Sequence, residues 1–217
     1  MSLPSRRVAV LVSGEGTNLQ ALIDTERAGR LGATVCAVLS DRADARGLER
    51  ARTAGIAAHS IAVGPTSESH YDAALREALI ELAPDMIVLA GYMRILSPAC
   101  VGAFADRTVN LHPSLLPRHK GVDTHRRVLA AGETEHGATV HFVTPALDAG
   151  PRILQYRLHV RPTDTPETLS ARVHRGEHII LPTVVRWFCS GRVRLVGDTV
   201  VLDNEPLSEP VVFEERT

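Results

Sequence analysis

The sequence contains almost no lysine and no long apolar run. Lys120 is the only lysine among the 217 residues, and the other basic side chains, histidine apart, are arginines. Schiff-base, pyridoxal-phosphate and Walker-type chemistry all require a lysine, so only Lys120 could serve them. The run Val8–Val12 is too short for a signal sequence, and no stretch approaches the roughly 20 apolar residues of a membrane span. We therefore expect no membrane partner.

Cysteine and net charge are also low. Cys36, Cys100 and Cys189 are far apart, odd in number and match no metal or redox spacing, which favours a reducing, cytoplasmic setting. The formal net charge is −1, so no general attraction to nucleic acid is expected. Any anionic ligand must therefore be held locally, by backbone N–H groups or a few arginines.

Strand-like and helix-like segments alternate through the first half of the chain. The expected strands are 8–12, 34–39, 57–63, 85–90 and 108–111, and the expected helices are 18–30, 45–54 and 71–82. Uninterrupted apolar strands that alternate with helices predict a parallel sheet covered on both faces.

The pattern changes after about residue 120. A helix is expected at 122–131, strands at 138–143 and 153–160, and a long helix at 165–188 with Pro182 as a candidate break. Segments 192–195 and 199–202 flank Gly197-Asp198 and predict a hairpin. The tail 204–217 is expected to be loosely held. With no repeat or linker, the pattern predicts one domain.

The glycine-rich turn Ser13–Asn18 joins the first expected strand to the first expected helix. Free backbone N–H groups and the positive end of the helix dipole suit a phosphate at this position. The third glycine of a dinucleotide fingerprint would fall at Leu19, and no Lys-Ser/Thr pair follows, so neither that fingerprint nor a P-loop fits. A cradle for a phosphate monoester is favoured over a strand–helix turn without a ligand.

Asn110 and His112 lie on one face of an expected strand that Pro113 ends. Ligands bind at the C-terminal ends of strands in open α/β sheets, so the pair is a candidate site. The amide could donate to a developing oxyanion, and the imidazole could move protons. A polar strand end with purely structural hydrogen bonds is the alternative.

Asp148 lies in the segment Leu147–Pro151, after the expected strand 138–143. A turn there could return its carboxylate to the same edge of the sheet, where it would orient His112 and favour the imidazolium form. An aspartate shortly before Gly-Pro is otherwise an ordinary turn residue.

Two other groups of residues are weaker candidates. His112, His119 and His125 are close in sequence but lack a recognised zinc spacing, so no metal is expected. Asp41 stands where a Rossmann acid would hold a ribose, but the matching glycine pattern is missing, and a solvated loop charge is favoured.

Several distant segments together resemble the folate-dependent phosphoribosylglycinamide formyltransferases, a family of purine biosynthesis. The resemblance runs from about Arg7 to Leu202 and is carried by SGEGTNLQ, LAGYMRILSP, NLHPSLLP, Thr124–Arg126, HFVTPALDAGP and RVHRGEH. It implies a Rossmann-like α/β formyltransferase fold, with a mostly parallel central sheet flanked by helices, a long C-terminal helix and a β-hairpin. Within one domain, 1–217, the phosphate-binding half would be 1–110 and the folate-binding and catalytic half 111–203.

The resemblance also implies roles for individual residues. Those implied to bind the acceptor substrate are Gly16, Thr17 and Asn18 at the phosphate, His174 near it, and Glu177 at the ribose hydroxyls. Those implied to line the pterin pocket of 10-formyltetrahydrofolate, largely through backbone groups, are Met93, Arg94, Ile95 and Leu96. The implied catalytic residues are Asn110, His112 and Asp148. His174 stands where relatives often carry Gln or Lys, which would make phosphate binding depend on pH.

The implied reaction moves a formyl group directly from 10-formyltetrahydrofolate to the amine of glycinamide ribonucleotide. Asn110 and protonated His112 would stabilise the oxyanion, and Asp148 would support His112 and relay a proton, with no metal. The chain would be a monomer or a homodimer. Other functions stay open: a formyltransferase or formyltetrahydrofolate hydrolase of the same fold acting on another acceptor, and a non-catalytic nucleotide-binding module.

Overall fold

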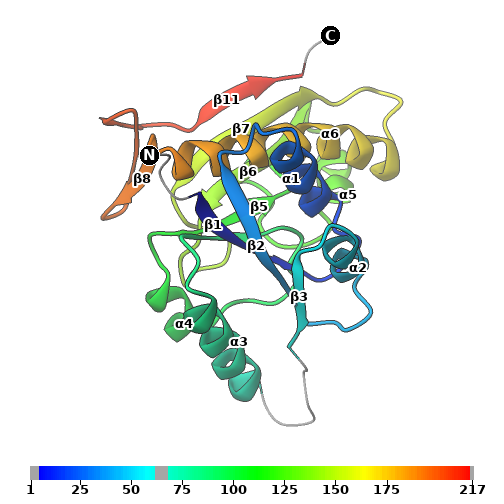
Figure 1. The fold of residues 1–217 in the computed structure, drawn as a ribbon. Coiled ribbons are helices and arrows are strands. Elements are labelled where there is room, and N and C mark those ends of the chain that lie inside the picture. Colours follow the sequence, from blue (N-terminus) through cyan, green and yellow to red (C-terminus); the bar gives the residue numbers. More distant parts are fainter. Residues whose placement is uncertain (1–4, 62–67, 216–217) are drawn as a thin grey trace.

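A central sheet runs through the protein in the order β11-β7-β6-β5-β4-β1-β2-β3 (Figure 1). The computed structural model describes residues 5–61 and 68–215. The strands of the central sheet are β1 (Arg6–Val12), β2 (Ala33–Ser40), β3 (Ala57–Ser60), β4 (Met86–Leu89), β5 (Thr108–His112), β6 (Glu135–Phe142), β7 (Arg152–His159) and β11 (Val211–Glu214). A smaller sheet contains β8 (Val193–Val196), β9 (Thr199–Leu202) and β10 (Glu205–Pro206).

All the pairings in the central sheet are parallel except the two made by β6, which runs antiparallel to both β5 and β7. The prediction of a mostly parallel sheet flanked by helices is confirmed, as is the hairpin of β8 and β9. The strand expected at 57–63 is observed over Ala57–Ser60, and its residues 62–63 lie outside the described part of the chain.

Helices cover both faces of the sheet, and alternate residues of β1 mark the two sides. The helices are α1 (Thr17–Arg27), α2 (Arg46–Thr53), α3 (Glu68–Leu82), α4 (Pro98–Ala103), α5 (Thr124–Ala130) and α6 (Pro166–Cys189). Val8, Val10 and Val12 pack in one core with α1, α2, α5 and α6. Ala9 and Leu11 pack in a second core with α3 and α4, which lie on the opposite side of the sheet in Figure 1. Within the described residues, no helix is long and apolar enough to cross a bilayer.

Helix α6 continues through Pro182 without a break, so the candidate break is wrong. A proline inside a helix removes one backbone hydrogen bond. Ile180, Leu181, Val184 and Val185 are fully buried around it, and this packing outweighs the lost bond. Farther toward the N-terminus, a Cβ on Gly176 would lie 1.9 Å from the Tyr156 ring, so only glycine lets α6 approach β7 this closely.

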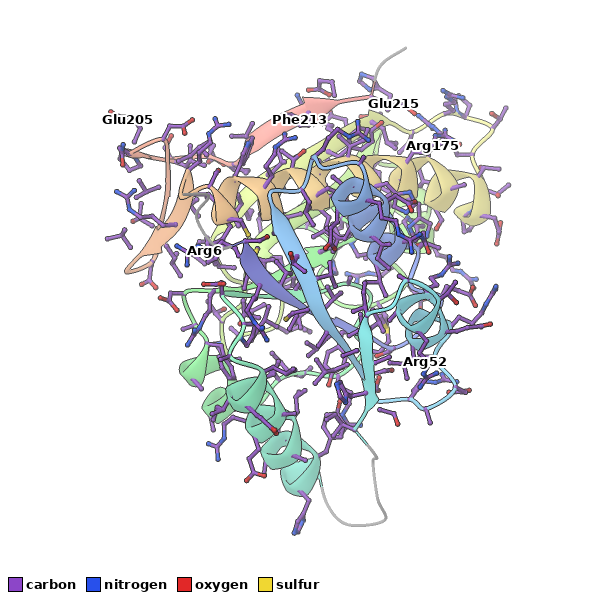
Figure 2. The ribbon with its side chains drawn as sticks, viewed as in Figure 1. Arg6, Arg52, Arg175, Glu205, Phe213 and Glu215 are labelled. Atoms are coloured by element: carbon purple, nitrogen blue, oxygen red, sulfur yellow. The ribbon has the colours of Figure 1, made fainter. Side chains whose placement is uncertain are left out.

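The C-terminal tail is not loosely held over the residues that the structure describes. Strand β11 pairs in parallel with β7 through four consecutive residues, and Phe213 packs edge-on against Trp187 of α6. Figure 2 shows Phe213 and Glu215 along this segment. The sequence of the tail gave no sign of this pairing because the edge of β7 that it covers is formed by tertiary structure.

Arg172 of α6 fastens this tail to the body of the protein. Its guanidinium donates to the Glu215 carboxylate through two nitrogens, to Asp164, and to the His159 carbonyl at 2.8 Å. The Arg172 and Asp164 side chains are 6% and 4% exposed. Water therefore solvates neither charge well, and each charge is stabilised by its hydrogen-bond partners instead.

We expect Arg172→Met to lower the free energy of unfolding by about 3 kcal/mol, because two largely buried carboxylates lose their cation. Urea denaturation at pH 7 measures the effect. The matched control is Arg157→Met on β7, the strand that pairs with β11. Arg157 pairs with Glu214 but is 40% exposed, so its loss should change the free energy of unfolding by less than about 1 kcal/mol. Equal losses in the two variants would contradict the role given to Arg172.

Candidate active site

A cavity of about 480 Å³ lies where β4 and β5 end and α1 begins. Its walls come from segments that are far apart in the sequence: Asn18, residues 91–96, residues 110–113, residues 121–125, residues 143–148, and His174 with Glu177. All three proposed catalytic residues, all four proposed folate-contacting residues, and three of the five proposed acceptor-binding residues line it. Gly16 and Thr17 are not among the lining residues.

Asn110, His112 and Asp148 meet in this cavity. His112 Nδ1 lies 3.3 Å from Asp148 Oδ2, and both side chains are 7% exposed. Asn110 Nδ2 lies 3.4 Å from Asp148 Oδ1. The backbone N–H of Gly121 also donates to Asp148 Oδ2, at 2.9 Å. The carboxylate is therefore surrounded by three donors, two from β5 and one from the loop that follows it.

Asp148 reaches His112 by a different route from the expected one. Because β6 is antiparallel to β5, the chain leaves β6 beside the start of β5, where the Val143 N–H donates to the Thr108 carbonyl. The segment 143–148 therefore begins beside the start of β5 and runs back along this strand to bring Asp148 to His112. It does not make its turn at the C-terminal edge of the sheet. Asp148 adopts a left-handed backbone conformation, with φ of 47°, which aspartate tolerates better than most residues.

Each nitrogen of the His112 ring faces an oxygen that can accept a hydrogen bond. Nδ1 faces the Asp148 carboxylate, and Nε2 lies 2.9 Å from the carbonyl oxygen of His119. Both of these oxygens only accept hydrogen bonds, so a proton on either ring nitrogen finds an acceptor. His112 is thus placed as a hydrogen-bond donor from either side of the ring.

His141 is a site residue that sequence reasoning missed. It stands directly opposite Asn110 in the β5–β6 pairing, and its Nε2 lies 3.2 Å from Asn110 Nδ2. Its Nδ1–H donates to the Phe142 carbonyl at 2.8 Å, which leaves Nε2 free to accept. Burial lowers the pKa of His141 to about 4, so the ring is neutral at pH 7. His141 and Asp148 together direct the Asn110 amide, and only the antiparallel register reveals this.

The glycine-rich turn places the N-terminus of α1 at one end of the cavity. Gly16 is the N-cap of α1 with φ of 70°, and a Cβ there would lie 2.6 Å from the Gly47 Cα, so both conformation and space require glycine. The first N–H groups of α1 have no partner within the helix and carry the positive end of its dipole. This geometry suits the phosphate cradle predicted for residues 16–18.

Glu177 joins this turn to α6. It is 3% exposed, and its Oε2 accepts hydrogen bonds from Asn18 Nδ2 at 2.8 Å and from His174 Nδ1 at 2.7 Å. Burial pushes the pKa of Glu177 up, but the hydrogen bond and charge of His174 and the hydrogen bond from Asn18 outweigh burial and leave this pKa below its usual value. The hydrogen bond to Glu177 raises the pKa of His174 against the effect of burial. The interaction therefore favours the carboxylate form of Glu177 and the imidazolium form of His174.

One buried acceptor in the cavity lacks a partner. Among the residues that the structure describes, Asn18 Oδ1 accepts no hydrogen bond, although the Asn18 amide nitrogen is held by Glu177. Buried polar atoms normally have partners. A ligand with a hydroxyl or amide N–H donor at this end of the cavity would supply one.

The loop 91–96 forms the other end of the cavity and is apolar at its mouth. Met93 and Ile95 are 70% and 69% exposed, whereas Leu96 is buried. The Arg94 guanidinium lies 4.5 Å from the centroid of the Tyr71 ring. Exposed apolar side chains around a cavity mouth suit a flat, partly aromatic ligand.

The weaker candidates have other partners. His119 bonds Glu133 at 2.6 Å and His125 bonds His136 at 2.9 Å, while His112 faces Asp148. Within residues 5–61 and 68–215, no group of three or more potential ligands could hold a metal ion. Asp41 accepts a hydrogen bond from Ser13 at 2.6 Å and does not line the cavity.

A comparison with models of protein families shows which family the chain belongs to. The family model described as formyl transferase matches residues 6–185, which is most of the chain. The chain belongs to the formyl transferase family. The prediction of an α/β transferase related to purine biosynthesis is thereby confirmed, in agreement with the individual relatives.

Known members of the formyl transferase family match over nearly the whole chain. Phosphoribosylglycinamide formyltransferase of Escherichia coli (strain K12) is 49% identical over 201 residues, 92% of this chain and 95% of that protein. The solved phosphoribosylglycinamide formyltransferase from Coxiella burnetii aligns with a TM-score of 0.92 at 48% identity, over 96% of this chain and 99% of that one. A formyltetrahydrofolate deformylase from Pseudomonas syringae aligns with a TM-score of 0.84 at 27% identity, over 91% of this chain and 66% of that one.

We expect the His174 ring to titrate above its ordinary value of 6.5 and to shift downward in Glu177→Gln, where burial opposes protonation without a carboxylate to offset it. Because the folded-state pKa is raised, the stability that protonation contributes is present below pH 6.5 and is lost as pH rises through the raised value. NMR titration of the ring resonances measures the His174 pKa in the wild type and in Glu177→Gln.

His141 is the internal control, because burial lowers its pKa to about 4 and the charges that act on it come from Asp148, His112 and Lys120 rather than from Glu177. An unchanged His174 midpoint in Glu177→Gln would show that the pair is not coupled as described.

Proposed function

We propose that this chain transfers the formyl group of 10-formyltetrahydrofolate to the amine of glycinamide ribonucleotide, giving formylglycinamide ribonucleotide and tetrahydrofolate. The observation that carries the proposal is the convergence of Asn110, His112 and Asp148 on one cavity. This cavity is also lined by the glycine-rich turn at Asn18 and by the loop 91–96 with its exposed apolar side chains. The close relatives named above support it.

The end of the cavity near α1 suits the acceptor. The N-terminus of α1 offers N–H groups and a positive dipole to a phosphate, and the His174 imidazolium adds a charge. Glu177 and the unpartnered Asn18 Oδ1 can accept hydrogen bonds from ribose hydroxyls. We assign Gly16, Thr17, Asn18, His174 and Glu177 to this substrate.

The end formed by residues 91–96 suits the formyl donor. The loop contributes Met93, Arg94, Ile95 and Leu96 to the cavity wall. We assign these residues to the pterin, whose polar edge their backbone groups can read while the apolar side chains cover its flat faces. The formyl carbon of the folate would then lie at the catalytic trio.

The trio can stabilise the negative oxygen that develops when the amine nitrogen bonds to the formyl carbon. The Asn110 amide and the His112 Nε2–H are the donors. For this oxygen the amide exchanges its long contact with Asp148, and His112 exchanges the His119 carbonyl. Asp148 holds the His112 ring and takes part, through water, in moving the proton from the attacking amine toward the folate nitrogen that leaves. Holding both substrates in one cavity contributes much of the rate enhancement.

Deformylation of the same folate by water is the alternative within this family. It would use the trio but would leave the α1 turn and the Asn18–Glu177–His174 cluster without a ligand. We therefore favour the phosphorylated amine acceptor, and an assay with and without glycinamide ribonucleotide separates the two reactions.

We expect His112→Ala and Asp148→Asn each to reduce kcat by about 10²- to 10⁴-fold, the usual range for loss of general acid–base groups, while folate binding persists. Release of tetrahydrofolate from 10-formyltetrahydrofolate, followed with and without glycinamide ribonucleotide, measures the reaction. Release that is independent of the ribonucleotide would favour the hydrolase, and full turnover in either variant would remove the assigned roles.

Glu177→Gln should raise KM for glycinamide ribonucleotide by about 10-fold, since a hydrogen bond to a charged group contributes roughly 1.5 kcal/mol or more. KM for 10-formyltetrahydrofolate is the internal control and should stay within about twofold, because Glu177 lies at the opposite end of the cavity. Initial-rate kinetics with each substrate varied in turn give both constants. A parallel rise in both KM values would contradict the assignment.

A further inference from the structure

Ser13 joins the glycine-rich turn to the loop 91–96 outside the cavity. It follows β1, is 4% exposed and does not line the cavity. Its backbone N–H donates to the Gly91 carbonyl at 3.1 Å, which extends the β1–β4 ladder by one more rung. Its Oγ then makes two further hydrogen bonds, to Met93 and to Asp41.

The direction of these side-chain bonds is fixed by chemistry. The Met93 backbone N–H can only donate, so Ser13 Oγ accepts from it at 2.9 Å. The hydroxyl proton is then available to Asp41 Oδ1, which lies 2.6 Å away. Asp41 thus orients the hydroxyl, and the hydroxyl orients the backbone at Met93. These two hydrogen bonds give Asp41 a role other than the ribose contact considered from the sequence.

The Ser13–Met93 hydrogen bond joins the two segments assigned above to different substrates. Ser13 begins the turn that ends at Asn18, and Met93 belongs to the loop 91–96, which lines the cavity. Tyr92 in the same loop is held by a hydrogen bond between its hydroxyl and that of Tyr71 on α3. The loop is therefore fixed from β1 on one side and from α3 on the other.

We propose that Ser13 and Asp41 are positioning residues, which set the separation between the attacking amine and the formyl carbon by tying the two substrate-binding segments together. This inference rests on the proposed function, because the two segments must hold different substrates. A displacement of reacting groups by about 1 Å can lower the rate up to about 10²-fold, so loss of the tie should act mainly on kcat.

The test compares Ser13→Ala, Asp41→Ala, Asp41→Asn and the double variant Ser13→Ala/Asp41→Ala. We expect Ser13→Ala and Asp41→Ala to lower kcat about 10-fold, with the Kd of each substrate alone changed less than about threefold. Asp41→Asn keeps an acceptor for the Ser13 hydroxyl and should recover most of the activity. The double variant should be no slower than either single variant, because both remove the same chain of bonds.

Ser40→Ala is the matched control. Ser40 is fully buried and precedes Asp41, but its hydroxyl accepts only a local bond from the Arg42 N–H, so kcat should stay near that of the wild type. A Ser13→Ala protein with normal kcat, additive losses in the double variant, or an equal loss in Ser40→Ala would each overturn the positioning role. If the wild-type protein itself does not formylate glycinamide ribonucleotide, the proposed function fails instead.

Discussion

The buried carboxylate of Asp148 is the constraint on which the site depends. At 7% exposure it receives little solvation from water, and a buried charge without partners would cost several kcal/mol. Its donors are the His112 ring, the Asn110 amide and the Gly121 backbone N–H. Because these groups come from β5 and from a separate loop, satisfying one charge fixes the imidazole, the amide and the loop at once. The same carboxylate holds the His112 ring by its Nδ1 side.

Two other carboxylates organise the ends of the cavity in a similar way. Glu177 binds Asn18 from α1 and His174 from its own helix, and the three form a polar end in which the carboxylate of Glu177 and the imidazolium of His174 favour each other. Asp41 orients Ser13, which holds the loop 91–96. Charge-assisted hydrogen bonds are short and directional, so the bond between Asp41 and Ser13 helps to transmit the rigidity of the sheet to the loop 91–96.

The sheet determines where this network can form. Helices α3 and α4 pack against β1, β2 and β4 on one face. Farther along the same sheet, the reversed strand β6 presents Thr139 and His141, and the chain after β5 covers β6 and β7 through Leu116, whose carbonyl accepts from Gln155. Loops and polar side chains thus replace a helical layer beside β5. The cavity lies at the ends of β4 and β5, where these loops meet α1, α5 and α6.

By itself the sequence determined the alternation of strands and helices, the glycine-rich turn, the polar end of β5 and, through the resemblance of its motifs, the family. Those features are local, because they follow from periodicity, from glycine conformation and from short runs of residues. Sequence reasoning did not find the pairing of β11 with β7, the continuation of α6 through Pro182, the return of residues 143–148 along β5, or His141 opposite Asn110. Each of these depends on strand register or on packing between distant segments. Only the tertiary structure decides them, because a strand edge, a buried helix face or a cross-strand neighbour exists only after the other segments are in place.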